Sequence, residues 1–594
     1  MPSRGLTWRR FLPASLVLLV PVLGGAAATA EDPAYAYEPI QEEDEAPGPG
    51  VSTAEVCTRC HAGAETAQAM RDAKGRSVAP VDLWRSSMMA NSARDPFWRA
   101  VVRAEMAATP NAAEAIAAKC LSCHAPLANQ VGLDDHGTGD PLHVLDCESE
   151  LGELARDGVS CTICHGISPE GLGTPASYTA GFVINDQLAL YGPHKDPITR
   201  PMEFHSGFTP TYGEHITSSA HCGSCHTLIT DALSPAGEVV GTGFHEQTTY
   251  LEWRNSVFSD EGPDGQTLEE VPGTARSCQD CHTPTTDEDG RPIRTALAHN
   301  PGGFDFPFVQ PRKPFGRHLF VGGNTFVLSL LRDHAEELGV TAPREAFDAT
   351  IEATREQLAS RTARIGMKEV AAPEGVDGVL AVEVEVTNLT GHKLPSGHPS
   401  RRMWLEVVAK TLEGDVVFSS GRWNERGLIV GPDGEALPTE RADGPIEPHR
   451  DVVAAQDQVA RFRGVMADAK GDPTFLLLRG DGWFVDDRLL PRGWSADHPD
   501  AAHTGPAGVE GDADFPQGKG SVSDGRDRVT YLVPAPAGVE LVIQARLVHQ
   551  AVSPRYVADA LRFEAPEIER FLAMEREADR SPEILASGLW RGSR

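Results

Sequence analysis

The chain has 594 residues, and its 53 Lys and Arg against 85 Asp and Glu give a formal net charge of −32 at pH 7. Hydrophobic residues make up 40%, and with the 58 glycines the apolar share is about half, which is ordinary for a globular protein. A wholly disordered chain and a fibrous repeat are therefore excluded. The negative charge also excludes nucleic acid as an expected partner, and it favours partner proteins with a basic docking patch.

The N-terminal segment has the features of an export signal. Three arginines precede a mostly apolar stretch over residues 11–27, and an Ala-Thr-Ala cleavage site ends at Ala30. This predicts a signal peptide over residues 1–30 and a periplasmic or secreted mature protein. An uncleaved anchor is the alternative, which two prolines in the stretch disfavour. Residues 31–50 are acidic and rich in Pro and Gly, and they predict a flexible leader. No later stretch predicts a transmembrane segment.

Ten of the eleven cysteines fall into five copies of the pattern Cys-x-x-Cys-His. Two thiols at this spacing can form thioethers with the two vinyl groups of one haem, and the adjacent imidazole then binds the iron as proximal ligand. One copy could be a zinc half-site or a redox disulfide. Five copies predict five covalently attached c-type haems with their irons. The attachment cysteines are Cys57, Cys60, Cys120, Cys123, Cys161, Cys164, Cys222, Cys225, Cys278 and Cys281, and the proximal histidines are His61, His124, His165, His226 and His282.

Three sulfur-containing residues outside the motifs have open roles. Cys147 could be a reactive thiol, an intermolecular bridge or a small buried residue, and we favour the last. Met88 and Met89 could supply an iron ligand or pack against a porphyrin face. Packing is the commoner role of methionine, and we favour it here.

Residues 51–335 carry all five motifs and predict a pentahaem cytochrome domain of short helices and irregular loops. Apolar residues at helical spacing predict helices over 96–109 and 111–120, between loops rich in Gly and Pro. Haems in such a domain would supply much of the apolar core. A connecting segment over 336–370 follows, with a predicted helix over 344–363.

The composition changes after Pro373. Residues 379–386 alternate apolar and polar side chains with period two, which is typical of a half-buried strand, and similar patterns lie at 403–410, 529–533 and 539–548. They predict an antiparallel, β-sandwich-like domain over residues 371–560. A charged helix near 565–579 predicts a C-terminal helical segment over 561–594. The predicted fold is thus a mainly α or irregular multihaem domain, a β domain and a C-terminal helix.

The sequence resembles exported multihaem c-type cytochromes with a C-terminal β domain. They belong to the superfamily of the tetrahaem cytochrome of ammonia oxidisers and of hydroxylamine oxidoreductase. The resemblance covers roughly residues 51–495. Besides the haem motifs, it rests on residues 87–96 (SMMANSARDP), 158–160 (GVS), 250–256 (YLEWRNS), 318–324 (HLFVGGN), 390–397 (TGHKLPSG) and 487–493 (DRLLPRG).

The resemblance implies two distal iron ligands, His318 of the HLFVGGN stretch and His392 of the TGHKLPSG stretch. Because His392 follows the first predicted strand, its ligation would dock the β domain on the haem domain. His194, His205 and His215 precede the fourth motif closely, and we expect two of the three to be distal ligands, with His205 and His215 ahead. Weaker candidates are His136, His143, His245, His299 and His334, whereas His449, His498, His503 and His549 are expected at the surface.

Two functions are compatible with these motifs, and we favour the first, with the second as the alternative. If every iron has a second protein ligand, the chain is an electron carrier of a periplasmic or extracytoplasmic respiratory chain. If one iron is five-coordinate, the chain is an oxidoreductase for a small nitrogen or sulfur compound. A Cys-x-x-Cys-Lys site, the variant of pentahaem nitrite reductases, does not occur in the sequence. The β domain could also serve as an adhesion or docking module, alongside either function.

Overall fold

The computed structural model describes residues 50–132, 139–241 and 243–594. The predicted signal peptide and residues 31–49 of the predicted leader lie outside the described residues, and so does His136. The described residues belong to one unit, Ala46–Arg594. Within them, no helix is long and apolar enough to cross a membrane.

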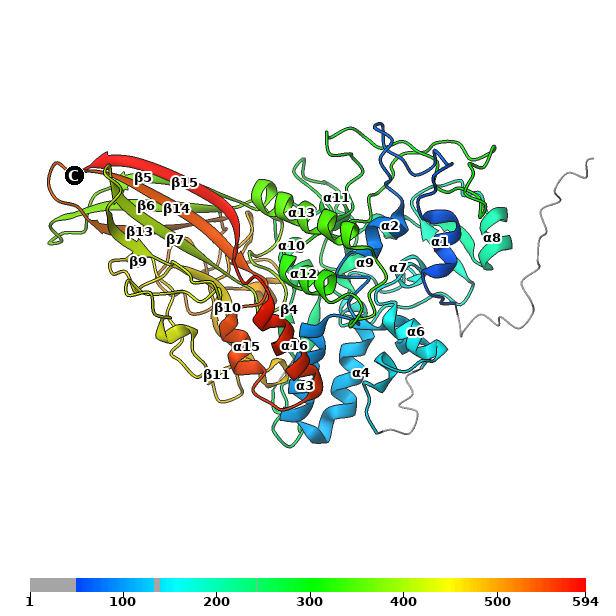
Figure 1. The fold of residues 1–594 in the computed structure, drawn as a ribbon, viewed down its shortest axis with the longest axis horizontal. Coiled ribbons are helices and arrows are strands. Elements are labelled where there is room, and N and C mark those ends of the chain that lie inside the picture. Colours follow the sequence, from blue (N-terminus) through cyan, green and yellow to red (C-terminus); the bar gives the residue numbers. More distant parts are fainter. Residues whose placement is uncertain (1–49, 133–138, 242) are drawn as a thin grey trace, which may run out of the picture. The chain divides into compact units, whose positions relative to one another are not determined.

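Short helices joined by loops form residues 51–335 (Figure 1). The helices are α1 (Glu55–His61), α2 (Pro80–Arg85), α3 (Pro96–Ala108), α4 (Ala113–His124), α5 (Pro126–Val131), α6 (Glu150–Arg156), α7 (Cys161–Gly166), α8 (Arg200–Ser206), α9 (Ser219–Gly223), α10 (Thr249–Arg254), α11 (Cys278–His282) and α12 (Thr325–Asp333). Two pairs of short strands lie between them: β1 (Ala189–Gly192) is parallel to β2 (Thr209–Tyr212), and β3 (Leu228–Thr230) is antiparallel to β4 (Phe244–Gln247).

Helix α3 shows why the predicted helix over 96–109 forms. The Asp95 carboxylate caps its start by accepting hydrogen bonds from the backbone N–H groups of Phe97 (2.8 Å) and Trp98 (3.1 Å). Pro96 occupies the first turn, where its missing N–H costs nothing. Two apolar faces are buried: Phe97 packs in a cluster with α12 and α16 (Pro566–Glu577), and Trp98 packs in a cluster with α4. The prediction of this helix is confirmed.

Two β-sheets dominate the second half of the chain. One sheet has the strand order β11-β10-β7-β14-β15, with β12 beside β10 and β8 beside β7; the other has the order β5-β6-β13-β9. The strands are β5 (Ala363–Val370), β6 (Val379–Asn388), β7 (Arg402–Thr411), β8 (Val416–Ser420), β9 (Val452–Val453), β10 (Arg461–Ala467), β11 (Pro473–Thr474), β12 (Gly482–Asp486), β13 (Arg526–Pro534), β14 (Glu540–Gln550) and β15 (Glu583–Ser593).

The apolar alternation of the sequence forms the core between the sheets. In β6 the side chains of Val382, Val384 and Val386 are fully buried, while the intervening residues are less so. They join one cluster with residues of the other sheet such as Leu405 and Leu547. Alternate side chains of a strand point to opposite faces, so each strand turns one face inward. The four predicted strands over 379–386, 403–410, 529–533 and 539–548 are confirmed as β6, β7, β13 and β14.

The connecting and C-terminal segments differ from the prediction. The helix α13 spans Arg344–Arg361, but residues 363–370, assigned to the helical connection, form β5 and pair with β6. The predicted C-terminal helix is present as α16, but residues 583–593 form β15 and pair antiparallel with β14. Both strands lie at the ends of their sheets. Pairing with a long neighbour stabilises them, which local sequence does not reveal.

Buried polar contacts join the haem-motif half to the β half. On α10, Glu252 accepts hydrogen bonds from the backbone N–H of Lys393 (3.1 Å) and the hydroxyl of Ser396 (2.6 Å). The neighbouring Arg254 forms an ion pair with Asp500 (2.5 Å). These groups are buried, so the loop that follows β6 is held firmly against α10.

Candidate haem centres

The five motifs stand on or beside short helices. Four of them lie on α1, α4, α7 and α11, and the fourth motif begins in α9. Residues three apart on a helix share one face, so the two thiols of a motif point the same way. A capping box between Ser277 and Asp280 fixes the start of α11. None of the ten motif cysteines is paired in a disulfide.

Four of the five motif imidazoles are oriented by a backbone carbonyl. In each, Nδ1 donates a hydrogen bond to the carbonyl oxygen: His61 to Leu297 (3.1 Å), His124 to Ser92 (3.1 Å), His165 to Tyr191 (2.6 Å) and His282 to Val321 (2.8 Å). A carbonyl only accepts, so Nδ1 carries the proton and Nε2 keeps a free lone pair. This is the usual arrangement of a histidine that binds a metal through Nε2.

Burial also keeps these imidazoles neutral. It lowers the pKa of His61 and of His124 to about 4, and it lowers the pKa of His165 and of His282. Burial, followed by the nearby His282 and Arg401, lowers the pKa of His226 to about 4, although part of its surface is exposed. A neutral imidazole is the form that binds a metal. The residues of the motifs therefore fit covalently attached haem.

The motifs lie next to one another in space. The thiols of Cys57 and Cys161 interact, which connects the first motif with the third. The fourth motif has two such contacts: Cys225 interacts with Cys123 of the second motif, and Cys222 interacts with Cys278 of the fifth. The third motif adjoins the fourth. Hydrogen bonds with other cysteines and burial raise the pKa of Cys222 and of Cys225 most, and the nearby Cys164 adds a smaller electrostatic contribution to both. The five motifs thus form one connected set, branched at the fourth.

His318 lies opposite the third motif. Its Nδ1 donates to the carbonyl of Gly316 (3.0 Å), which leaves Nε2 free, and burial lowers its pKa to about 4. Its ring centre lies 6.2 Å from that of His165, and the two rings are 23° from parallel. Two metal–nitrogen bonds of about 2 Å each, plus about 1 Å from each nitrogen to its ring centre, amount to about 6 Å. The pair therefore has the spacing of two imidazoles on one iron.

His392 faces the fourth and fifth motifs. Its Nδ1 donates to the carbonyl of Lys393 (2.8 Å), and its ring is close enough to lower the pKa of both His226 and His282, after burial itself. Glu252 holds the loop that carries it, as described above.

A buried charge cluster fixes the same loop. The Lys393 ammonium contacts the Asp486 carboxylate (2.5 Å), and Arg488 contacts both Asp486 (2.7 Å) and Glu252 (3.3 Å). Burial alone would raise the pKa of Asp486, but the cations Arg488 and Lys393 outweigh it and lower that pKa to about 2. The carboxylate is therefore ionised, and it ties β12 to the loop next to His392.

The three remaining distal candidates lack this arrangement. His215 donates from Nε2 to the carbonyl of Ile167 (2.9 Å), so only its Nδ1 has a free lone pair, and its ring lies 6.2 Å from that of His221. His205 lies on α8 against Phe204, which is 57% exposed. For His194, burial and the nearby Arg312 lower the pKa. Among the described residues, no contact with a motif histidine is found for His194 or His205.

The structure adds His398, a candidate that no sequence motif singled out. Its ring contacts Phe97 and Tyr556, with ring centres 5.7 and 5.2 Å apart. The backbone N–H of Ser400 donates to its Nδ1 (3.1 Å), and burial, Arg401 and the nearby His124 lower its pKa to about 3. The sequence could not identify His398 as a candidate, because distal ligands follow no spacing rule.

The structure shows the surroundings of four further residues outside the motifs, and two of them, His549 and His449, differ from the expectation. His549 was expected at the surface, but it is only 4% exposed, in β14. His449 is also buried among carboxylates rather than at the surface. Met88 packs against an apolar cluster that includes Phe97. The thiol of Cys147 lies 3.0 Å from the hydroxyl of Ser149 and is half-buried.

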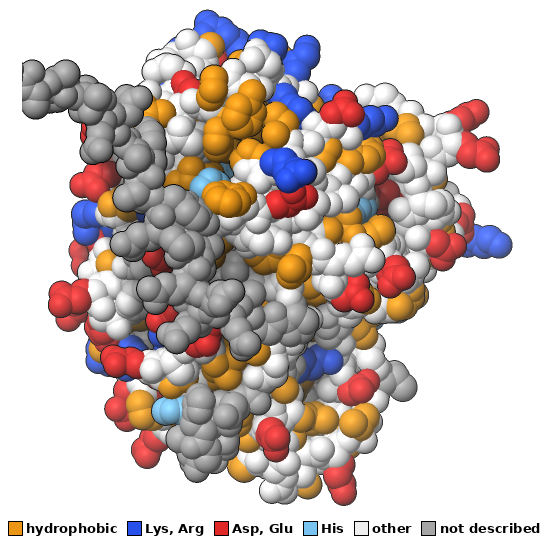
Figure 2. All heavy atoms as spheres, turned by 90° about the vertical axis from the view of Figure 1, so that its right-hand side faces the viewer, with side chains coloured by type: hydrophobic (Ala, Val, Ile, Leu, Met, Phe, Trp, Pro, Cys, Tyr) orange, Lys and Arg blue, Asp and Glu red, His pale blue; other side chains and the backbone are white. Residues whose placement is uncertain are grey.

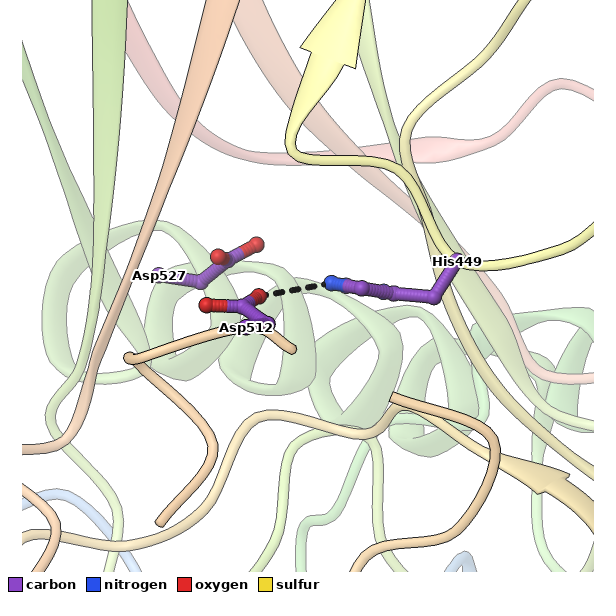
Figure 3. Close-up of side chains that lie close together, drawn as sticks. All are labelled: His449, Asp512 and Asp527. Atoms are coloured by element: carbon purple, nitrogen blue, oxygen red, sulfur yellow. Dashed lines mark hydrogen bonds and ion pairs between the residues drawn. The ribbon is translucent and has the colours of Figure 1, made fainter. Parts of the chain in front are cut away.

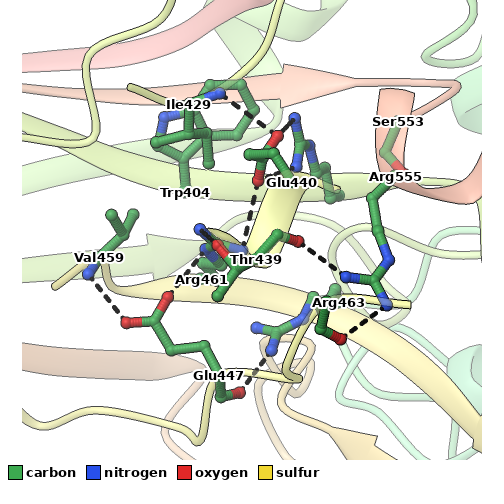
Figure 4. Close-up of polar contacts among 12 residues, drawn as sticks. Trp404, Ile429, Thr439, Glu440, Glu447, Val459, Arg461, Arg463, Ser553 and Arg555 are labelled. Carbon is green, nitrogen blue, oxygen red and sulfur yellow. Dashed lines mark hydrogen bonds and ion pairs between the residues drawn. The ribbon is translucent and has the colours of Figure 1, made fainter. Parts of the chain in front are cut away.

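Several arginines, among them Arg401, Arg402 and Arg461, line one cavity in the β half. Arg402 binds both oxygens of Glu440 (2.8 Å each). Arg461 contacts Glu447 (3.3 Å), as Figure 4 shows. The guanidinium of Arg401 lies at this cavity and donates a hydrogen bond to the Ser396 carbonyl (2.5 Å). Among the described residues, no carboxylate lies within ion-pair distance of Arg401.

Comparisons with known proteins give one similar structure. No family model matches the chain, and no curated protein matches it. Among solved structures, the crystal structure of a penta-heme cytochrome c552 from Thermochromatium tepidum is similar, with 16% sequence identity and a TM-score of 0.47. The alignment covers 91% of this chain and 99% of that chain. The haem assignment rests instead on the motifs and side-chain geometry of this chain itself.

Proposed function

We propose that this chain is a multihaem c-type cytochrome that carries electrons through five covalently bound haems. The observation that carries the proposal is that five Cys-x-x-Cys-His motifs, far apart in the sequence, form one connected set. Cys57, Cys225 and Cys222 contact cysteines of other motifs, and Cys164 brings the third motif next to the fourth. Each haem, when bound, would supply an iron that gains and loses one electron. Neighbouring motifs would hold such groups close together.

The protein residues around the motifs have identifiable tasks. The ten cysteines would attach the haems, and the five motif histidines would be their proximal ligands. Backbone carbonyls fix four of the five motif imidazoles with Nε2 free, and burial keeps all five neutral. His318 and His392 offer a second nitrogen each, opposite the third motif and near the fourth and fifth. A second protein ligand favours electron transfer over substrate binding.

The setting we propose is the periplasm or another extracytoplasmic space, within a respiratory chain. The export signal over residues 1–30 supports this location. The net charge of −32 supports redox partner proteins that dock through a basic patch. Figure 2 shows acidic side chains spread over one face of the molecule, whereas basic ones gather mainly at its upper edge.

A second candidate function is an oxidoreductase for a small nitrogen or sulfur compound. The observation that favours it is Arg401, a cation without a carboxylate partner among the described residues, beside His226 of the fourth motif. Arg401 is also near His398 and His549, whose pKa values burial and then this arginine lower to about 3. A guanidinium in such a place can bind an anion by paired hydrogen bonds.

Electron paramagnetic resonance of the fully oxidised protein, with haem counted per chain, tests the proposal. Five haems that are all low-spin and bind neither cyanide nor nitrite are the result expected of a carrier. One high-spin haem in five that binds either ligand would overturn the carrier function in favour of the second candidate. Fewer than five haems would overturn the assignment of the motifs.

A further inference from the structure

A cluster of carboxylates surrounds one histidine in the β half, away from the haem motifs. His449 precedes β9, Asp512 comes from the loop before β13, and Asp527 stands on β13 itself. One ligand atom of each lies within 4.8 Å of the others. Figure 3 shows the two carboxylates side by side, with the His449 ring pointing at them. Three separate segments of the chain therefore meet at this point.

The contacts around the histidine are short. Nε2 of His449 lies 2.8 Å from Asp512 and 3.3 Å from Asp451, and Nδ1 lies 3.6 Å from Asp487. The side chains of His449 and Asp512 are 7% and 8% exposed, whereas that of Asp451 is 48% exposed. The cluster is thus closed on the protein side and open to solvent past Asp451, which gives an ion a path of entry.

Asp527 is the unusual member of the cluster. The residue is fully buried, with 0% exposure, and neither carboxylate oxygen has a hydrogen-bond partner within the part of the chain that the structure describes. Buried polar groups in native proteins are almost always paired, and a buried ionised carboxylate without a partner costs several kcal/mol. Such a side chain, aimed at two other ligand groups, indicates a bound cation.

The carboxylates of the cluster carry more negative charge than its histidine can balance. Two neighbouring carboxylates each have an arginine partner. Asp487 accepts a hydrogen bond from the backbone N–H of Arg463 (2.6 Å) and lies 3.5 Å from its guanidinium, and Asp514 pairs with Arg528. Three carboxylates remain against one imidazole. Even a protonated imidazole leaves an excess of negative charge.

We propose that this cluster binds one divalent metal ion through His449, Asp512 and Asp527, with Asp451 completing the set from the solvent side. Carboxylates and one imidazole suit Zn²⁺ or Mn²⁺ better than Ca²⁺, which prefers oxygen ligands alone. The ion would join the segment before β9, the loop before β13 and β13 itself. It is separate from the haem irons, so its presence does not depend on the proposed function.

Metal analysis of the purified full-length protein, with its haems in place, tests this site. The protein is dialysed against Zn²⁺, Mn²⁺ or Ca²⁺ in separate samples, then against metal-free buffer, and its metals are counted by mass spectrometry. We expect one equivalent of Zn²⁺ or Mn²⁺ per chain in addition to haem iron. Asp527→Asn and His449→Ala should weaken binding by about tenfold or more, since each removes a ligand.

Asp524→Asn is the matched control. Asp524 lies three residues before Asp527 and pairs with Arg528, but its side chain is 52% exposed and outside the cluster. This variant should bind as the wild type does. If Asp527→Asn folds poorly, Asp512→Asn replaces it, and the metal-dependent rise of Tm, present in wild type and control, should be absent. Equal binding by Asp527→Asn and the control, binding insensitive to His449→Ala, or no retained metal in the wild type would each overturn the proposal.

Discussion

The two halves of this chain bury their apolar residues in different ways. In the β half, one continuous cluster between the two sheets contains fully buried residues such as Val384, Leu405 and Leu547. In the half with the haem motifs, apolar residues are divided among several clusters, the larger ones around Trp98 and around Phe97 and smaller ones around Met70 and around Trp253. A packed sheet pair forms its own core, whereas short helices and loops need further apolar groups. We expect the proposed haems to supply them.

The largest effect should come from removing the fourth motif. The double variant Cys222→Ala, Cys225→Ala should lose more than one haem per chain, because this motif contacts the second and fifth motifs. The double variant Cys57→Ala, Cys60→Ala removes a motif at the end of the set and should lose only one haem. The pyridine haemochrome spectrum per chain measures both losses. Cys147→Ala, the control, should keep five; equal losses in the two double variants would contradict the branched arrangement.

The next effect concerns the joint between the halves. Asp486→Asn should lower the free energy of unfolding by about 3–5 kcal/mol, because it leaves Lys393 and Arg488 buried without their carboxylate. The stabilising effect of this carboxylate should also depend on pH. Arg488 and Lys393 lower the pKa of Asp486 to about 2, although burial acts in the opposite direction. Its contribution to stability is fully present above the unfolded pKa, about 4, and is lost as pH falls through about 2.

Urea unfolding of wild type and Asp486→Asn at neutral and acid pH measures this effect. The difference between the two should shrink as the pH falls toward 2, since the wild-type carboxylate becomes protonated. Asp443→Asn is the control, because that side chain is 80% exposed. A difference that stays constant with pH would show that the carboxylate charge is not the cause.

A somewhat smaller effect tests the core of the β half alone. Leu547→Ala removes a fully buried side chain and should cost about 2–5 kcal/mol of unfolding free energy. The visible spectrum of the haems should stay unchanged, because the cluster lies between the sheets. Leu589→Ala on β15, where the side chain is 68% exposed, should change stability by less than about 0.5 kcal/mol. A changed haem spectrum in Leu547→Ala would show that the halves do not hold their cores separately.

The smallest effect should come from Glu252→Gln. The glutamine keeps one acceptor for the loop but loses the charge that faces Arg488, so His392 is held less firmly. Electron paramagnetic resonance should then show a fraction of one haem in five converted to the high-spin form. Glu214→Gln, at an exposed position, should leave the spectrum of the wild type. A full conversion of one haem would show that Glu252 does more than position the loop.

Local patterns predicted part of this fold well. The period-two alternation of Val382, Val384 and Val386 identified β6, because alternate residues of a strand lie on one face. Strand β15 escaped prediction, since Gly588 and Gly592 interrupt its apolar pattern and its partner β14 supplies the stabilising bonds. Strand β5 was taken as part of a helical connection for the same reason.

The amino-acid sequence by itself determined the five thiol-and-imidazole motifs, because covalent attachment of haem demands a fixed local spacing. It also determined the main strands of the sandwich. Only the tertiary structure decided that His318 lies opposite His165, that His398 joins the candidates, and that Asp527 meets His449. Such groups come together from distant parts of the chain, and their meeting depends on how loops pack against helices and sheets. No local period in the sequence encodes that packing.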